Sequence, residues 1–157
     1  MADQAQIDKD IAAITERTHD KMNAAISQDI DWIMSNYWNS PDFVLFDPCP
    51  GIYVGWQTLK DIFLDYHGKW PRMSAKIDNL RVGVDGDLGY AFSIQEWTFH
   101  RPDGTDDVLV HRITEIWKRF DGEWKCIHEH ASVPQDLLGD DRTASNEDNP
   151  DAARVLS

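Results

Sequence analysis

The sequence predicts an α+β fold in which helices near the N-terminus cover one face of an antiparallel sheet. In the first part of the chain, apolar residues recur at three- and four-residue steps, the spacing of an amphipathic helix. From residue 72 onward apolar residues alternate with polar or small ones, as in a half-buried strand. Short turns separate the alternating segments, and such turns require antiparallel neighbours. Helices first and a meander second therefore indicate the α+β class.

Three amphipathic helices are predicted before residue 70. The first begins close to the N-terminus, and Asp29 can cap a second helix, which Ser40-Pro41-Asp42 ends. The third follows Gly55 and is expected to end at His67-Gly68, because glycine is the usual left-handed helix terminator. Each helix carries one apolar stripe, formed by Ile7, Ile11, Ile14, Thr18, Met22 and Ile26, then by Ile30, Ile33, Met34 and Tyr37, and then by Leu59, Ile62, Phe63 and Tyr66.

One short strand and a meander of four strands are predicted. The short strand, residues 43–46, ends at Asp47-Pro48. The meander strands are expected around Leu80, Val82 and Val84 and over residues 88–99, 108–120 and 124–133, with turns at Asp85-Gly86-Asp87, Arg101-Pro102-Asp103-Gly104 and Asp121-Gly122.

The composition favours one soluble domain. The 157 residues are 41% hydrophobic and include seven Trp and six Phe, enough for one sizeable core. The formal net charge of −13 argues against nucleic acid and anionic membrane surfaces as partners. No apolar run approaches the ~20 residues of a membrane span, and the N-terminus lacks the pattern of a signal peptide, so a cytoplasmic location is expected.

Residues 1–134 are expected to form the domain, because no internal repeat or earlier boundary is evident. Residues 135–157 carry six acidic against two basic side chains. Between Asp140 and Asp151 they hold no Val, Ile, Leu or aromatic residue, so they bury too little apolar area to offset their ordering entropy. We interpret this segment as a mobile tail, and an acidic interaction tail is the alternative.

Asp47 is the first candidate for chemistry, because it ends an apolar strand where the sheet edge meets a loop. Apolar and aromatic neighbours such as Phe46, Tyr53 and Trp56 would make its carboxylate a stronger base than one in water, as a general base near neutral pH requires. The alternative is a strand-end Asp that caps a turn.

Carboxylates and histidines on the later strands are further candidates. An inward-facing Glu96, Glu115 or Glu129 would be costly unless paired or functional, whereas an outward one would be solvated. His128 and His130 lie on one strand face, but two ligands without a third make a weak metal signal. No nucleotide-binding or zinc-hydrolase motif is present, and neither a metal nor a cofactor is expected.

The two cysteines, Cys49 and Cys126, have no neighbouring base and are expected to be buried hydrophobes. Aromatic residues exceed what a small core needs, so some could line an apolar cavity or an oligomer interface, although a core position is the alternative for each. They are Trp32, Tyr37, Trp38, Tyr53, Trp56, Trp70 and Trp97.

Residues 112–134 resemble the closing hairpin of SnoaL-like proteins, through the pattern R-x-T-x-x-W, then D-G-x-W, then H-x-H-x-S. These proteins belong to the nuclear transport factor 2-like superfamily, with ketosteroid isomerases and polyketide cyclases. The segment is similar also to the association domain of calcium/calmodulin-dependent protein kinase II. The resemblance implies a cone-shaped α+β roll, with three N-terminal helices packed on a curved antiparallel sheet around an apolar pocket. It also implies a homodimer or higher homo-oligomer packed through the sheet.

Phe46-Asp47-Pro48 looks like the stretch of ketosteroid isomerases in which the Asp is the general base, which implies that role for Asp47. Those enzymes place an acidic Tyr on the first helix, where this chain has Thr18, His19, Lys21 and Met22, so the steroid-type oxyanion hole is in doubt. Similarity to the kinase association domain implies that Glu115 and Glu129 face the pocket, with His128 and His130 on the opposite face. His111, Ile113 and Trp117 share the face of Glu115, with Ser93, Gln95 and Trp97 opposite them.

The first functional hypothesis is a cofactor-independent lyase, dehydratase or isomerase acting on a small aromatic or cyclic apolar molecule. The alternative is a non-catalytic ligand-binding or oligomerisation module of the same fold. A closed apolar cavity with two or more inward carboxylates would favour catalysis, and a cavity filled by Trp and Phe side chains would favour the alternative. The catalytic candidates are Asp47, His111, Glu115 and Glu129, and the substrate-binding candidates are His19, Trp38, Tyr53, Trp56, Ser93, Trp97 and Trp117.

Overall fold

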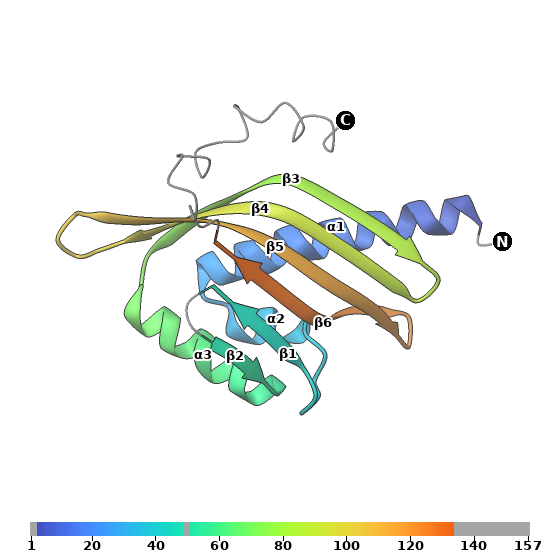
Figure 1. Ribbon diagram of the computed structural model, residues 1–157, viewed down its shortest axis with the longest axis horizontal. Coiled ribbons are helices and arrows are strands. Elements are labelled where there is room, and N and C mark those ends of the chain that lie inside the picture. The colour runs from blue at the N-terminus through green and yellow to red at the C-terminus, as the bar shows by residue number, and fades with distance from the viewer. Residues whose placement is uncertain (1–2, 49–50, 134–157) are drawn as a thin grey trace, which may run out of the picture.

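A computed structural model describes residues 3–48 and 51–133 (Figure 1). In these ranges three helices pack on a curved sheet whose strand order is β2-β1-β6-β5-β4-β3. The predicted α+β class is therefore confirmed. The elements are α1 (Gln4–Ser27), α2 (Ile30–Ser35), β1 (Val44–Asp47), β2 (Gly51–Val54), α3 (Trp56–Lys69), β3 (Met73–Asp85), β4 (Leu88–His100), β5 (Asp106–Phe120) and β6 (Glu123–Ser132).

Helix α1 runs along one face of the sheet (Figure 1). Its N-terminus is capped by Asp3, whose side chain accepts a hydrogen bond from the backbone N–H of Ala5, and it ends at Gln28 in the left-handed conformation. Asp29 caps α2, as predicted, by accepting a hydrogen bond from the N–H of Trp32 at 3.0 Å. Two caps in succession turn the chain, and α2 packs against both α1 and α3.

Strands β3 to β6 form the predicted antiparallel meander. Strand β1 adds to its edge in parallel with β6, so that Leu45 lies opposite Glu129, and the sheet is mixed rather than wholly antiparallel. Strand β2, which the sequence did not predict, pairs antiparallel with β1. Its four residues lie at the sheet edge with Ile52 and Val54 exposed, so they carry too short an alternation to identify a strand.

Helix α3 continues one residue past Gly68, where the sequence predicted its end. The N–H of Trp70 donates a hydrogen bond to the carbonyl of Tyr66, which completes the last turn. Gly68 has no positive φ and therefore does not act as a terminator. This last turn matters because Tyr66, His67 and Trp70 all reach the cavity described below.

The core lies between the helices and the inner face of the sheet. Ile14, Ile33 and Phe43 are fully buried there. Cys126 is also fully buried, and burial raises the pKa of its thiol, which confirms it as a buried hydrophobe. Cys49 and the predicted tail, residues 135–157, lie outside the described residues, as does the end of the predicted domain at residue 134. Within the described ranges no helix is long and apolar enough to cross a membrane.

Candidate functional site

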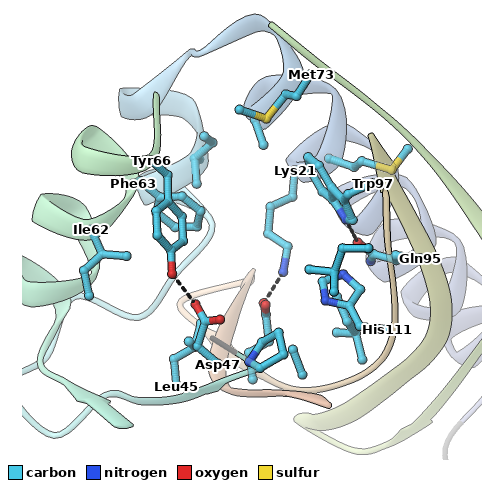
Figure 2. Close-up of a pocket in the computed structure, with 18 of the residues that line it drawn as sticks. Lys21, Leu45, Asp47, Ile62, Phe63, Tyr66, Met73, Gln95, Trp97 and His111 are labelled. Carbon is cyan, nitrogen blue, oxygen red and sulfur yellow. Dashed lines mark hydrogen bonds and ion pairs between the residues drawn. The ribbon is translucent and has the colours of Figure 1, made fainter. Parts of the chain in front are cut away.

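A cavity of about 380 Å³ opens between α3, the end of β1 and the inner face of β4, β5 and β6. Ile62 and Phe63 of α3 form one apolar wall and Trp97 of β4 lies on the opposite wall (Figure 2). The volume is at the lower end of the range for small-molecule sites, and the apolar lining with a few polar groups is typical of them. The polar groups therefore decide what chemistry the cavity supports.

A buried cluster of one ammonium and two carboxylates lies at the base of the cavity. Lys21 of α1 contacts Glu115 of β5 through its Nζ atom, and the same atom lies 2.6 Å from an oxygen of Glu129 of β6. The two glutamates are opposite each other across the β5–β6 pair. One cation therefore faces two like charges that adjacent strands bring together.

Hydrogen bonds hold both glutamates of this cluster. Glu115 accepts from the hydroxyl of Thr18 at 3.0 Å and from the indole N–H of Trp117 at 3.1 Å. Glu129 accepts from the hydroxyl of Tyr37 at 2.8 Å. A buried charge is tolerated only when it is paired and hydrogen-bonded in this way.

The cluster controls the ionisation of Glu129. Burial by itself would raise the pKa of the Glu129 carboxyl, but the ammonium of Lys21 and the hydroxyl of Tyr37 outweigh burial and hold the pKa below its usual value. Burial would lower the pKa of Lys21, but Glu115 and Glu129 raise it well above the usual value. Glu129 is therefore an ionised acceptor at neutral pH, and Lys21 is charged.

Asp47 lies at the end of β1, where its side chain meets Tyr66 of α3 (Figure 2). The hydroxyl of Tyr66 donates a hydrogen bond of 3.0 Å to a carboxylate oxygen of Asp47. Burial first, and then the neighbouring Tyr53 and Asp47, raise the pKa of the Tyr66 phenol. Tyr66 therefore keeps its proton and orients the carboxylate at the cavity wall.

His111 of β5 lines the wall opposite Asp47 (Figure 2). Both of its ring nitrogens are buried and have no hydrogen-bond partner among the described residues. Burial lowers the pKa of the imidazole, although the charge of Glu129 partly opposes this. His111 is therefore neutral at neutral pH, with one N–H donor and one acceptor nitrogen unused.

Gln95 and Trp97 of β4 complete the polar groups of this wall. The indole N–H of Trp97 donates to the amide oxygen of Gln95 at 3.0 Å (Figure 2). The amide nitrogen of Gln95 lies 3.4 Å from the hydroxyl of Ser93, which is buried behind it. The alternation along β4 thus places Gln95 and Trp97 in the cavity wall and Ser93 one step deeper.

The cavity lining includes four of the predicted catalytic and substrate-binding residues: Asp47, His111, Glu129 and Trp97. Glu115 faces inward as expected but lies behind Lys21, outside the lining and 1% exposed. Trp117 is fully buried beside it. Glu115 therefore supports the site from behind and does not contact a ligand in the cavity.

Four other predicted binding residues require correction. His19 is exposed, because it is one residue past Thr18 and so points away from the buried face of α1. Trp38 and Trp56 line a second pocket on the other side of α2, where Trp38 stacks on Phe120. Tyr53 packs against the core beside Tyr66 and does not line the cavity.

Sequence reasoning gave no role to the ammonium of Lys21 or to the hydroxyls of Tyr37 and Tyr66, although Tyr37 was among the aromatic residues that could line a cavity. Tyr37 and Tyr66 were correctly placed on the apolar stripes of their helices, but this pattern does not indicate that their hydroxyls form hydrogen bonds. Lys21 carried a signal, because it stands three residues after Thr18 and therefore shares its buried helix face. A lysine in that position needs a carboxylate partner inside the fold.

His128 and His130 lie on the face away from the cavity, as predicted. Each imidazole forms a T-shaped contact with the ring of Phe46. The Nδ1 atom of His128 lies 2.9 Å from the carbonyl of Val44. Among residues 3–48 and 51–133, no group of three or more His, Cys, Asp or Glu residues could hold a metal ion.

Comparisons with known proteins agree with this geometry. The family model of the SnoaL-like domain matches residues 14–136. No curated protein matches the chain. The chain is similar to many solved structures, three of which are described below, and at these identities the likeness shows the fold alone.

The first is a candidate dehydratase of the NTF2-like family from Streptomyces avermitilis, with TM-score 0.77, 14% identity, and 82% and 99% of the two chains covered. The second is a candidate aromatic ring hydroxylase from Novosphingobium aromaticivorans, with TM-score 0.72, 17% identity, and 82% and 91% covered. The third is the association domain of the C. elegans calcium/calmodulin-dependent protein kinase II, with TM-score 0.61, 18% identity, and 82% and 96% covered.

Proposed function

The chain belongs to the SnoaL-like domain family, and from this premise we propose that it is an enzyme that moves a proton on a small, ring-bearing apolar molecule held in the cavity. The reaction is a lyase, dehydratase or isomerase step made by the protein's own side chains. Two of the three structures above carry the names of candidate enzymes, a dehydratase and a ring hydroxylase.

The observation that carries the proposal is the unsatisfied imidazole of His111. A buried polar group without a partner costs about 1–3 kcal/mol, and no described residue hydrogen-bonds either nitrogen of His111, so both nitrogens can bind a ligand in the cavity. His111 faces an open cavity that is otherwise apolar and that also contains the carboxylates of Asp47 and Glu129. The cavity is open rather than closed, but its two inward carboxylates meet the other part of the criterion that favours catalysis over a structural role.

In the proposed reaction Asp47 is the general base. Its carboxylate removes a proton from a ring carbon next to a carbonyl carbon, and Tyr66 holds the carboxylate in position. The electron pair of the broken C–H bond moves toward the substrate oxygen. Neutral His111 donates its N–H to that oxygen, as a neutral imidazole does in other proton-transfer sites. Return of the proton at another carbon completes an isomerisation, and loss of a leaving group completes an elimination.

The test begins with a screen of phenolic and cyclic-ketone compounds for a change in absorbance. With a substrate in hand, Asp47→Asn is expected to lower kcat by about 10²–10⁴-fold, the usual contribution of a general base. Asp42→Asn is the matched control, because Asp42 is exposed near the start of the same strand, and it should keep the wild-type kcat. Full turnover by Asp47→Asn would remove Asp47 from the role of base.

The oligomeric partner is proposed to be a second copy of the chain. The outer face of the sheet, opposite the cavity, is apolar and exposed at Leu88, Tyr90 and Phe92 of β4 and at Val110 of β5. An apolar patch of this kind is typical of an interaction surface. The chain's similarity to a kinase association domain supports the same inference. A purely associating module would not need an open cavity that contains two carboxylates, so we propose self-association in addition to the enzymatic function.

A further inference from the structure

Lys21 is the one Lys or Arg among the described residues that line the cavity. Its Nζ atom is held between Glu115 and Glu129, and the ammonium also lies 4.8 Å from the centre of the Tyr37 ring. The charge is therefore engaged inside the protein before any ligand arrives. It is not available as a counter-ion for one.

The cavity contains no other positive group at neutral pH among its described residues. The two histidines in its lining, His67 and His111, have pKa values lowered by burial. The buried cluster has one more carboxylate than it has ammonium groups, because Lys21 is paired with both Glu115 and Glu129. The local field of these groups is negative and is weakly screened by solvent because the groups are buried.

From this charge arrangement we propose that the cavity selects an uncharged ring compound with a hydroxyl or carbonyl group and rejects carboxylates of the same size. The inference rests on the proposed ligand site and names its substrate class. A carboxylate entering the cavity would lose its hydration without gaining a cation, and it would face Glu129 directly. A neutral ligand meets neither penalty.

The neutral polar groups of the wall match such a ligand. His111 offers one donor and one acceptor nitrogen, and a hydroxyl group can satisfy both roles while a carbonyl satisfies the first. The ring would lie against Phe63 and Trp97, whose side chains supply opposite walls (Figure 2). Hydrogen bonding and ring contact thus both favour the uncharged form.

The experiment compares a naphthol with the naphthoic acid of the same ring position at neutral pH, where the first is neutral and the second is an anion. Binding is followed by quenching of tryptophan fluorescence, since Trp70 and Trp97 line the cavity, and is confirmed by calorimetry. We expect the naphthoate Kd to be roughly 100-fold higher than the naphthol Kd, a typical cost of an unpaired charge in a binding site. Equal or tighter binding of naphthoate would overturn the proposal, and so would the absence of naphthol binding.

Glu129→Gln tests the cause of the selectivity. The variant leaves Lys21 facing one carboxylate, so the ratio of the naphthoate Kd to the naphthol Kd should fall by about tenfold. Glu123→Gln is the matched control on the same strand, since Glu123 is exposed and paired with Lys125, and it should keep the wild-type ratio. The naphthol Kd and the thermal unfolding curve show in the same samples that the variants are folded.

An unchanged ratio in Glu129→Gln would contradict the charge argument. Because the titrations measure binding alone, they separate this inference from the proposed reaction. Selective binding of naphthol with no turnover of any compound would sustain the inference and count against the enzyme. Turnover of a substrate together with equal binding of naphthoate and naphthol would support the enzyme and contradict the selectivity.

Discussion

Lys21 shows how one residue links the helical and strand halves of the molecule. It lies on the α1 face that packs on the sheet, and its partners are Glu115 on β5 and Glu129 on β6. Lys21 is 8% exposed, so its charge is stabilised mainly by these two carboxylates and hardly by solvent. Removing one member of a buried ion cluster leaves the others uncompensated, which costs more than the cluster contributes when intact.

Lys21→Met is therefore expected to lower the free energy of unfolding by about 3–5 kcal/mol. Urea unfolding followed by circular dichroism measures this change. Lys9→Met on the exposed face of the same helix is the control and should stay within about 0.5 kcal/mol of wild type. Adding Glu129→Gln to Lys21→Met should recover part of the lost stability. Equal losses in Lys21→Met and in the control Lys9→Met would contradict the ion-cluster explanation.

His111 predicts a pH dependence of stability. Burial lowers the pKa of its imidazole in the folded protein below the ordinary 6.5. As the pH falls below about 6.5, the unfolded chain takes up the proton first, so the free energy of unfolding decreases until the pH passes the folded pKa. His111→Gln removes this term, and its unfolding free energy should fall less than that of wild type between about pH 7 and pH 5.

Denaturant titrations at several pH values measure that slope. His130→Gln is the control, because His130 is exposed on the opposite sheet face, and it should keep the wild-type slope. The same slope in His111→Gln and wild type would show that His111 is not held neutral by the fold. The lowered pKa of Glu129 acts in the same direction at lower pH, where protonation of its carboxyl removes the stabilisation from Lys21.

At the scale of elements, a bulge in β6 decides which residues reach the cavity. The β5–β6 register shifts between Ile116 and Trp117, so that Trp117 pairs with Cys126 while Glu115 pairs with Glu129. Before the shift Trp124 and Cys126 are buried, and after it Glu129 and Ala131 are. Uninterrupted alternation from Trp124 would have turned Glu129 outward.

Replacing glycine by alanine is expected to have opposite effects on stability at the two ends of helix α3. Gly55, its N-cap, has φ of +92°, a conformation that side chains with a Cβ rarely adopt, so Gly55→Ala should lower the free energy of unfolding by about 1–3 kcal/mol. Gly68 is inside the helix with open space around it, so Gly68→Ala should raise stability by about 0.5–1 kcal/mol. Thermal and urea unfolding measure both changes, and destabilisation by Gly68→Ala would contradict the observed helix end.

At the scale of the whole molecule, the two faces of the sheet have different roles. The inner face holds the cavity and the ion cluster, and the outer face exposes the apolar residues of β4 and β5. Tyr90 and Phe92 stack on each other at 5.7 Å between ring centres on this outer face. An enzyme that covers the outer face by self-association leaves the mouth of its cavity accessible.

Leu88→Lys should therefore shift the protein from a dimer toward a monomer, because a charge would be buried without a partner in the proposed interface. Sedimentation velocity or light scattering measures the mass. Leu64→Lys on α3 is the matched control, since Leu64 is 51% exposed and Leu88 is 52% exposed, and it should leave the dimer intact. A monomeric wild-type protein would overturn the proposed interface.

The periodicity of the sequence predicted most of the elements, because helix and strand patterns depend on neighbours a few residues apart. It missed β2 and the last residues of α3, which depend on an edge pairing with β1 and on a hydrogen bond from Trp70. For the site, alternation along β5 predicted that His111 and Glu115 share a face, which the structure confirms in part, since both face inward but only His111 reaches the cavity. His19, Trp38 and Trp56 were wrongly included, because sequence distance does not report which side of a helix a cavity lies on.

The sequence by itself determined the class of fold, the order of its elements and the acidic residues available for chemistry. These follow from local patterns and from residue identities. Only the tertiary structure decided that Lys21 neutralises part of that acidity, since its partner Glu129 is 108 residues away in the chain. Pairing of buried charges depends on contacts between distant segments and on depth below the surface, and neither quantity is written in local periodicity. The formal charge of −13 is a property of the sequence, whereas the sign of the field inside the cavity is a property of the fold.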